Sequence, residues 1–171
     1  ARDLLQRHER VVVCDVKKSP IPIYEQAEFI KCDITDRKAV DRLPIHSDDV
    51  VYNVAARMLH PIVRRQLRHD YFFSVDFEGA RNVVDAAMQA GCLRLVQFST
   101  DMVYGRLVTP PPIMEDHPRN PIGEYSDSKK HIEDYCMAKR RDGLKVSLFR
   151  PRLIIGPGRL GILTNLFKLI K

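Results

Sequence analysis

A tyrosine and a lysine stand four residues apart in the segment Y-S-D-S-K, at Tyr125 and Lys129. On a helix, side chains at i and i+4 share one face, so the phenol and the ammonium would lie close together. A neighbouring ammonium favours the phenolate and lowers the pKa of a tyrosine, which makes it a usable general base near neutral pH. Because this spacing also arises by chance on solvent-facing helices, the pair needs support from elsewhere in the chain.

Support comes from a hydrophobic segment about twenty-five residues upstream, which ends in polar groups. Residues 94–99 predict a buried strand that closes on Ser99, and Thr100 and Asp101 follow it directly. In an open parallel sheet, ligands bind at the carboxyl ends of the strands. A hydroxyl delivered there and a Tyr/Lys pair on the next helix could therefore meet over one substrate.

The elements that would position these residues follow from the hydrophobic pattern. Apolar runs of strand length alternate with helical patterns, which predicts βα repeats and a parallel sheet. Strands are expected at residues 10–15, 28–32, 49–54, 94–99 and 145–150. Helices are expected at residues 1–8, 35–43, 64–90, 125–142 and 161–171. Gly91 and Gly143 stand where helix C-termini favour glycine. Residues 106–124 contain five prolines and predict a long loop, a feature that is usually functional.

Composition limits the classes of partner. The 171 residues, 44% of them hydrophobic, can bury one sizeable core. The net charge of +6 is dispersed rather than striped, which argues against a nucleic-acid partner and favours an anionic small molecule. There is no apolar stretch of membrane-spanning length and no signal-peptide pattern, so a cytoplasmic protein without membrane contact is expected. Neither the four cysteines nor the histidines show metal-ligand spacing, and no metal site is predicted.

Three ordered motifs give the chain a family resemblance. They are S-T-D-M-V-Y-G at 99–105, Y-x-x-x-K at 125–129 and R-P-R-L-I-I-G-P-G at 150–158. Together they resemble the extended short-chain dehydrogenase/reductase family, in its NAD-dependent epimerase/dehydratase branch, over nearly the whole chain. The resemblance implies an α/β fold with a Rossmann-like, doubly wound parallel sheet, and NAD as the cofactor.

The resemblance also implies roles at the reacting end of the site. Thr100 would hydrogen-bond the reacting oxygen of the substrate, Tyr125 would take or give its proton, and Lys129 would hold the nicotinamide ribose. Asp101 and Met102 would also face the substrate. In similar sugar-nucleotide dehydratases, two acidic residues follow the threonine, whereas here the second position is Met102, which cannot transfer protons. The sequence thus disfavours a dehydratase and leaves epimerisation, or simple oxidation and reduction.

The cofactor residues implied by the resemblance follow the other strands. Asp15 closes a strand where a carboxylate could accept hydrogen bonds from both adenosine ribose hydroxyls and repel a 2′-phosphate, which favours NAD over NADP. A turn-forming aspartate is the alternative, and Lys17 and Lys18 weaken the repulsion. Asp33 and Ile34 would lie beside the adenine, unless Asp33 only begins a helix. The remaining positions match the same site: Asn53, Ala55, Ala56, Ser99 and Pro151, together with Tyr125 and Lys129.

Two departures from the family pattern matter. Residues 76–79 read D-F-E-G where the family more often has N-x-x-G, which puts a hydrogen bond from Asp76 in doubt. The chain also opens in a predicted helix, without a glycine-rich strand-turn. The first strand is central in the doubly wound order, so its absence would leave two strands roughly 5 Å beyond pairing distance. Residues 1–171 are therefore expected to be a partial NAD-binding domain, with a substrate lobe beginning at 159–171; a complete but divergent protein is the alternative.

Three functions remain open. The leading hypothesis is an NAD-dependent epimerase of a nucleoside-diphosphate sugar, acting through a transient keto intermediate. The second is a hydroxysteroid or other alcohol dehydrogenase with the same three catalytic residues. The third is a non-enzymatic Rossmann-like binding protein, which is disfavoured because binding alone needs no base beside an ammonium. The resemblance further implies a homodimer formed through the helices near 64–90 and 125–142.

Overall fold

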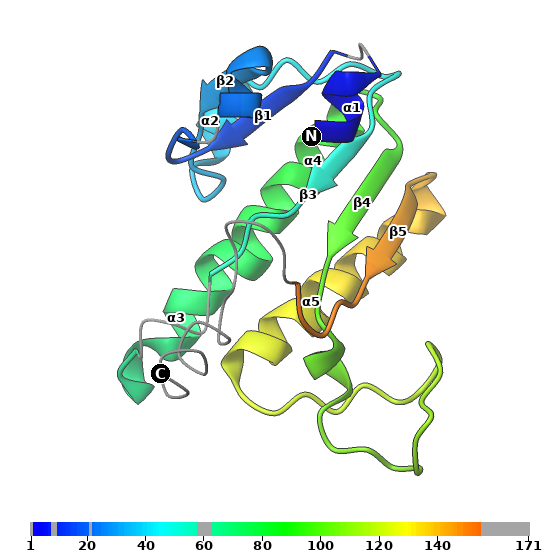
Figure 1. Ribbon diagram of the computed structural model, residues 1–171. Coiled ribbons are helices and arrows are strands. Elements are labelled where there is room, and N and C mark those ends of the chain that lie inside the picture. The colour runs from blue at the N-terminus through cyan, green and yellow to red at the C-terminus, as the bar shows by residue number, and fades with distance from the viewer. Residues whose placement is uncertain (1, 8–9, 21, 58–62, 155–171) are drawn as a thin grey trace, which may run out of the picture.

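In the described part of the chain, five strands and a set of helices make up the fold (Figure 1). The computed structural model describes residues 2–7, 10–20, 22–57 and 63–154. The strands are β1 Val12–Asp15, β2 Glu28–Lys31, β3 Val51–Asn53, β4 Arg94–Phe98 and β5 Lys145–Phe149. The α-helices are α1 Arg2–Gln6, α2 Arg37–Val40, α3 Arg68–Phe73, α4 Ala80–Gln89 and α5 Glu124–Lys139. The helix expected at 161–171 and the lobe expected at 159–171 lie outside the described residues.

The expected strands are confirmed, each one to three residues shorter than predicted. The helix expected at 64–90 is one helical run with an irregularity inside it. A short 3-10 turn, η2 (Arg65–Leu67), leads into α3, and a π-helical segment, η3 (Ser74–Gly79), joins α3 to α4. Two further 3-10 turns matter below, η4 (Asp101–Tyr104) after β4 and η5 (Arg140–Asp142) after α5. Gly91 and Gly143 end the two long helical runs with φ of 74° and 95°, in the left-handed region that glycine adopts without strain.

The strands form two separate sheets rather than one. β1 pairs in parallel with β2, and β3, β4 and β5 form a parallel sheet in that order. The edges of β1 and β3 that face away from these partners border one cavity of about 610 Å³. Val12 and Cys14 line it from β1, and Val51 and Asn53 line it from β3. The unpaired edges of β1 and β3 therefore lie on either side of this cavity.

The main core lies between the three-stranded sheet and the two long helices, which run side by side across it (Figure 1). Its buried residues come from α4, β4, α5 and the region of β5: Ala80, Val84, Leu95, Ile132, Cys136, Leu144 and Val146. The other face of this sheet carries exposed aromatic side chains, including Tyr52 and Phe149. Within the described residues, the helices are all too short or too polar to cross a membrane.

Candidate active site at the carboxyl ends of the strands

The segment after β4 holds its hydroxyls in a fixed turn. Ser99 and Thr100 are both buried. Thr100 caps η4, because its Oγ1 accepts a hydrogen bond from the Met102 backbone N–H at 3.3 Å. The Asp101 N–H donates to the Pro151 carbonyl at 3.4 Å, so the ends of β4 and β5 stay joined beyond the sheet. Thr100, Asp101 and Pro151 therefore meet at one edge, as the sequence predicted from parallel strands.

Helix α5 brings the predicted tyrosine and lysine to this edge. Gly123 precedes the helix with φ of 87°, and Tyr125 lies in the first turn. The Tyr125 ring packs edge-on against Phe72, with 5.6 Å between centroids. Tyr125 and Met102 line one cavity of about 290 Å³, whose other lining residues are Val63, Arg68, Phe72, Ile122, Gly123 and Glu124. The cavity thus places a residue of η4 and the first turn of α5 around a common space.

Lys129 points inward and makes a buried ion pair. Its side chain is 2% exposed, and its Nζ lies 3.0 Å from Oδ1 of Asp76, which is fully buried. The ammonium also donates to the Phe98 carbonyl at 3.4 Å, and Asp76 Oδ1 accepts from the Arg57 N–H at 3.2 Å. Burial raises the pKa of Asp76, and the nearby Lys129 ammonium opposes this shift. The sequence put a hydrogen bond from Asp76 in doubt, and this doubt was wrong. The Asp76 carboxylate accepts hydrogen bonds from the Lys129 ammonium and the Arg57 backbone N–H, so the position does not need an asparagine side chain.

Asp76 lies within the π-helical segment, which packs against α5. A π turn shifts the side chains that follow it relative to a regular helix, and such turns are frequent at functional sites. The same segment ends at Gly79, where an added Cβ would lie 2.8 Å from Cγ1 of Ile34. Gly79 thus lets the helix approach the loop after β2 closely. The sequence did not reveal this turn, because helical periodicity alone does not distinguish a single π turn.

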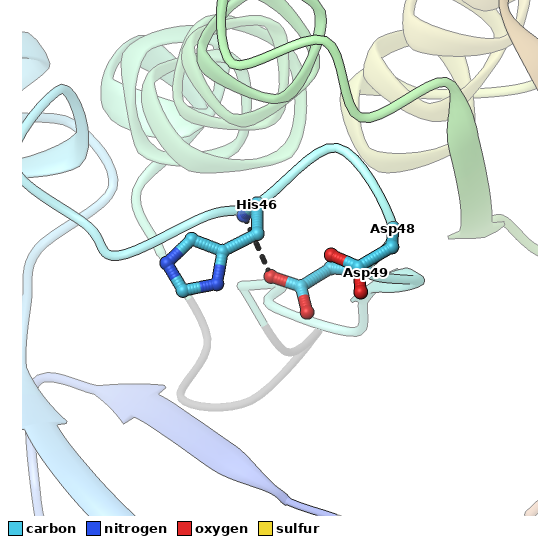
Figure 2. A group of neighbouring side chains, drawn as sticks. All are labelled: His46, Asp48 and Asp49. Atoms are coloured by element: carbon cyan, nitrogen blue, oxygen red, sulfur yellow. Dashed lines mark hydrogen bonds between the residues drawn. The ribbon is translucent and has the colours of Figure 1, made fainter.

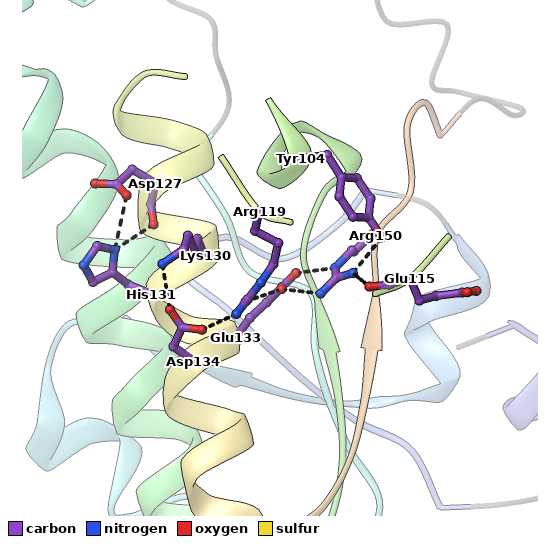
Figure 3. A network of polar contacts seen from close by, with 9 residues as sticks. All are labelled: Tyr104, Glu115, Arg119, Asp127, Lys130, His131, Glu133, Asp134 and Arg150. Atoms are coloured by element: carbon purple, nitrogen blue, oxygen red, sulfur yellow. Dashed lines mark hydrogen bonds and ion pairs between the residues drawn. The ribbon is translucent and has the colours of Figure 1, made fainter. Parts of the chain in front are cut away.

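A second network was missed by the sequence analysis (Figure 3). Glu133 is fully buried on α5 and accepts from Arg150 at 2.9 and 2.7 Å and from Arg119 at 2.8 Å. Arg150 also donates to the Tyr104 hydroxyl at 2.7 Å and to the Glu115 carbonyl at 2.9 Å. Although burial would raise it, the pKa of Glu133 lies below its ordinary value, because Arg150 hydrogen-bonds the carboxylate. One carboxylate thereby joins α5, the end of β5, η4 and the long loop.

A signal for Glu133 was present in the sequence. Tyr125, Lys129 and Glu133 follow one another at intervals of four, so all three share one face of α5. The network also fixes the long loop that runs from the end of η4 to the start of α5. Near its start, Gly105 forms a β-bridge with Asn120 of this loop. A Cβ on Gly105 would lie 1.8 Å from the Asn120 carbonyl oxygen, so only glycine permits this close approach.

The residues expected to bind the cofactor are brought together only in part. Ile34, Asn53 and Ala55 line the cavity between β1 and β3. The Asn53 amide donates to the Gln97 side chain at 2.9 Å, which joins β3 to β4 below the surface. Ala56 is exposed after β3, whereas Ser99 and Pro151 lie with Thr100 at the ends of β4 and β5. The cavity therefore collects three of the expected residues along the ends of two strands.

The two expected aspartates lie at exposed turns. Asp15 ends β1 and accepts from the Lys17 N–H at 3.1 Å. Asp33 follows β2 and accepts from the backbone N–H and the hydroxyl of Thr35, at 2.9 and 2.8 Å. These two hydrogen bonds lower the pKa of Asp33. Asp33 thus holds a turn before α2, whose N-cap is Asp36, while Asp15 keeps its second carboxylate oxygen outside the Lys17 hydrogen bond.

His46, Asp48 and Asp49 form a cluster in the loop just before β3, at the amino end of that strand and away from the candidate site (Figure 2). Their ligand atoms lie within 4.8 Å of one another, a closeness that sequence spacing did not indicate. The His46 backbone N–H donates to Asp49 Oδ2 at 2.7 Å, a turn that accounts for the approach of these exposed groups. The absence of a metal site stays a prediction.

Comparisons with known proteins identify one family that matches nearly the whole chain. The NAD dependent epimerase/dehydratase family matches residues 1–169. An uncharacterized protein, y4nG of Sinorhizobium fredii, is 33% identical over 98% of this chain and 40% of its own. A UDP-glucose 4-epimerase of Mycolicibacterium smegmatis is 31% identical over 78% of this chain and 42% of its own.

A solved structure is similar over the same range. The Bordetella bronchiseptica enzyme WbmH, in complex with NAD⁺, has a TM-score of 0.77 and 28% identity over 98% of this chain and 56% of its own. The chain spans less than half the length of the curated relatives named above.

Proposed function

Because the chain belongs to the NAD-dependent epimerase/dehydratase family, we propose that the full-length protein is an epimerase of a nucleoside-diphosphate sugar. The observation that carries the proposal is the cavity shared by Tyr125 and Met102, beside the Thr100 turn. A proton-transfer group and a hydrogen-bonding hydroxyl near one space are what reversible oxidation of a sugar hydroxyl requires. A cytoplasmic homodimer is part of the same proposal.

The described residues fit the proposed cofactor. Ile34, Asn53 and Ala55 would contact the dinucleotide at the carboxyl ends of β2 and β3, and Asp15 would bind the adenosine ribose. When bound, NAD supplies the redox chemistry, since it can take up a hydride and return it. The side chains of Ala55 and Ala56 leave room for close approach of the backbone to such a ligand.

The protein's own residues handle the proton of the substrate hydroxyl. Tyr125 takes this proton during oxidation and returns it during reduction. Thr100 orients the same oxygen by a hydrogen bond, and Lys129 stabilises the phenolate by its charge. Met102 faces the cavity and is 40% exposed, but it has no proton to exchange. The site therefore supports inversion at a carbon that bears a hydroxyl and does not support loss of water.

One observation favours a second candidate. Val63, Phe72, Met102 and Ile122 give the cavity beside Tyr125 a largely apolar wall. Such a wall suits a steroid or another apolar alcohol, oxidised in a single hydride transfer. Incubation of the full-length protein with NAD and each class of substrate distinguishes the two candidates. An epimerase converts the sugar nucleotide without a lasting rise in absorbance at 340 nm, whereas a dehydrogenase accumulates reduced cofactor in proportion to its ketone product.

The substrate assay is paired with a test of cofactor choice. Asp15 should make the full-length protein prefer NAD to NADP, because its carboxylate would meet the 2′-phosphate. We expect Asp15→Asn to reduce the ratio of the dissociation constant of NADP to that of NAD by about tenfold, which corresponds to roughly 1.4 kcal/mol. Calorimetric titration with both nucleotides measures the ratio. Equal or tighter binding of NADP by the unchanged protein would show that Lys17 and Lys18 dominate the local field.

The gap in the sheet supports a further part of the proposal, that these residues form a partial domain. Parallel backbone edges without a partner leave rows of donors and acceptors unmet, and one extended strand between β1 and β3 would satisfy both rows. In the full-length protein, we therefore expect slow amide hydrogen exchange along Val12–Asp15 and Val51–Asn53. In the 171-residue chain, the amides of these strands that face the gap should exchange at least about 100-fold faster. Equal rates in the two proteins would contradict an added strand.

A further inference from the structure

The buried pair of Asp76 and Lys129 places a negative charge next to the predicted catalytic lysine. The two side chains come from different elements, the π-helical segment and α5, which lie side by side (Figure 1). Both are almost completely buried, and 3.0 Å separates Nζ from Oδ1. The second carboxylate oxygen of Asp76 is buried without a hydrogen-bond partner among the described residues. A charge buried in this way acts strongly on its neighbours, because the protein interior screens it less than water does.

Among the described residues, charged groups near this pair and near Tyr125 come from several elements. Arg57 offers its backbone N–H to Asp76, while its guanidinium lies over the Tyr71 ring, 5.0 Å from the centroid. Arg68 and Glu124 line the cavity beside Tyr125. Asp101 lies in the turn after Thr100, where its carboxylate is 3.8 Å from the guanidinium of Arg152.

An ammonium paired at this distance presents a dipole rather than a full charge. The field of a dipole falls faster with distance than that of a single charge, so a paired lysine stabilises a neighbouring phenolate less than a free lysine does. An asparagine at position 76 would keep the shape and the acceptor oxygen but would leave the ammonium charge uncancelled. The difference between a carboxylate and an amide here is therefore electrostatic rather than steric.

We propose that Asp76 is a positioning residue for the Tyr125 and Lys129 pair. Its carboxylate fixes the lysine ammonium beside the carboxyl end of β4 and partly cancels the ammonium charge. This inference rests on the proposed role of Tyr125 in proton transfer. The carboxylate thereby sets the pH at which the phenol ionises, and it keeps Tyr125 protonated to higher pH than an asparagine would.

Titration of the phenol tests the inference without any need for turnover. In the full-length protein, ultraviolet difference absorbance at 295 nm, taken between each protein and its Tyr125→Phe counterpart, isolates the ionisation of Tyr125. We expect Asp76→Asn to move the midpoint to lower pH by about one unit, a tenfold change in the ionisation constant. The acidic limb of the pH–rate profile should move in the same direction. An unchanged or raised midpoint would overturn the proposal.

Two further variants make the test specific. Asp70→Asn removes the same charge from α3 at a side chain that is 88% exposed, and it should move the midpoint by less than about 0.2 unit. An equal shift in Asp70→Asn would mean that net charge alone is responsible and would overturn the proposal. Asp76→Ser gives a second neutral side chain if the asparagine variant folds poorly, and the same downward shift is expected.

The titration separates this inference from the proposed function. A downward shift in a protein that converts no sugar nucleotide would support the role of Asp76 and would contradict the epimerase proposal. Normal epimerisation, together with an unchanged midpoint in Asp76→Asn and Asp76→Ser, would support the epimerase proposal and overturn the role of Asp76.

Discussion

Replacing Tyr125 by phenylalanine in the full-length protein should lower the turnover number by about a hundred- to ten-thousand-fold, the usual contribution of a general acid or base. This corresponds to roughly 2.7 to 5.4 kcal/mol in activation free energy. The phenyl ring keeps the edge-on contact with Phe72, so only the proton-transfer group is lost. The affinity for NAD should stay within about threefold. Steady-state kinetics and calorimetric titration of NAD measure the two effects separately.

Two companion variants sharpen this prediction. Lys129→Met should reduce both turnover and NAD affinity, because Lys129 has two proposed roles. Tyr135→Phe makes the same substitution elsewhere on α5, where the hydroxyl donates to Asp85, and should leave turnover nearly unchanged. If Tyr125→Phe kept near-normal turnover on the true substrate, the tyrosine and lysine would be structural and a binding protein would become the better hypothesis.

The second large effect concerns stability. Removing the arginine in Arg150→Met leaves the buried Glu133 carboxylate with Arg119 as its remaining guanidinium partner. Breaking a buried ion pair from one side costs about 3–5 kcal/mol, because the remaining charge has lost part of its compensation. We expect a loss of this size in the free energy of unfolding, measured by urea denaturation of the full-length protein. Arg10→Met removes an exposed pair with Glu28 and should cost less than about 1 kcal/mol.

The same network predicts a dependence on pH. Since the folded pKa of Glu133 lies below its ordinary value of 4.5, its contribution is present above pH 4.5 and is lost as the pH falls through the folded pKa. Glu133→Gln should therefore be less stable than the unchanged protein at neutral pH, with a smaller difference in acid. Denaturation curves at several pH values below 5 measure this. A difference that grows toward acid would contradict the assignment.

The strands and the location of the candidate site could be predicted because local patterns determine them. Apolar runs gave β1 to β5, and the parallel order brought Thr100 and Pro151 to one edge without further information. The i, i+4 spacing placed Tyr125 and Lys129 on one helix.

Long-range partners could not be predicted in the same way. Glu133 meets Arg119 from a loop and Arg150 from the end of β5, and no periodicity connects these three positions. The ion pair of Asp76 with Lys129 joins a π-helical segment to α5, and a single π turn leaves helical periodicity almost unchanged. The sequence identified position 76 as a departure from the family pattern. Only the packing of two helices showed that its carboxylate has a buried cation beside it.

The most direct test of the central claim is a ¹H NMR measurement of the reaction in deuterated water. A panel of nucleoside-diphosphate sugars is incubated with the full-length protein and NAD, beside the Tyr125→Phe variant. The account predicts that one sugar nucleotide converts to its epimer, that the inverted carbon keeps its own hydrogen, and that the variant is slower by about a hundredfold or more. Deuterium at the inverted carbon, or no conversion of any sugar nucleotide by a protein that binds NAD, would contradict it.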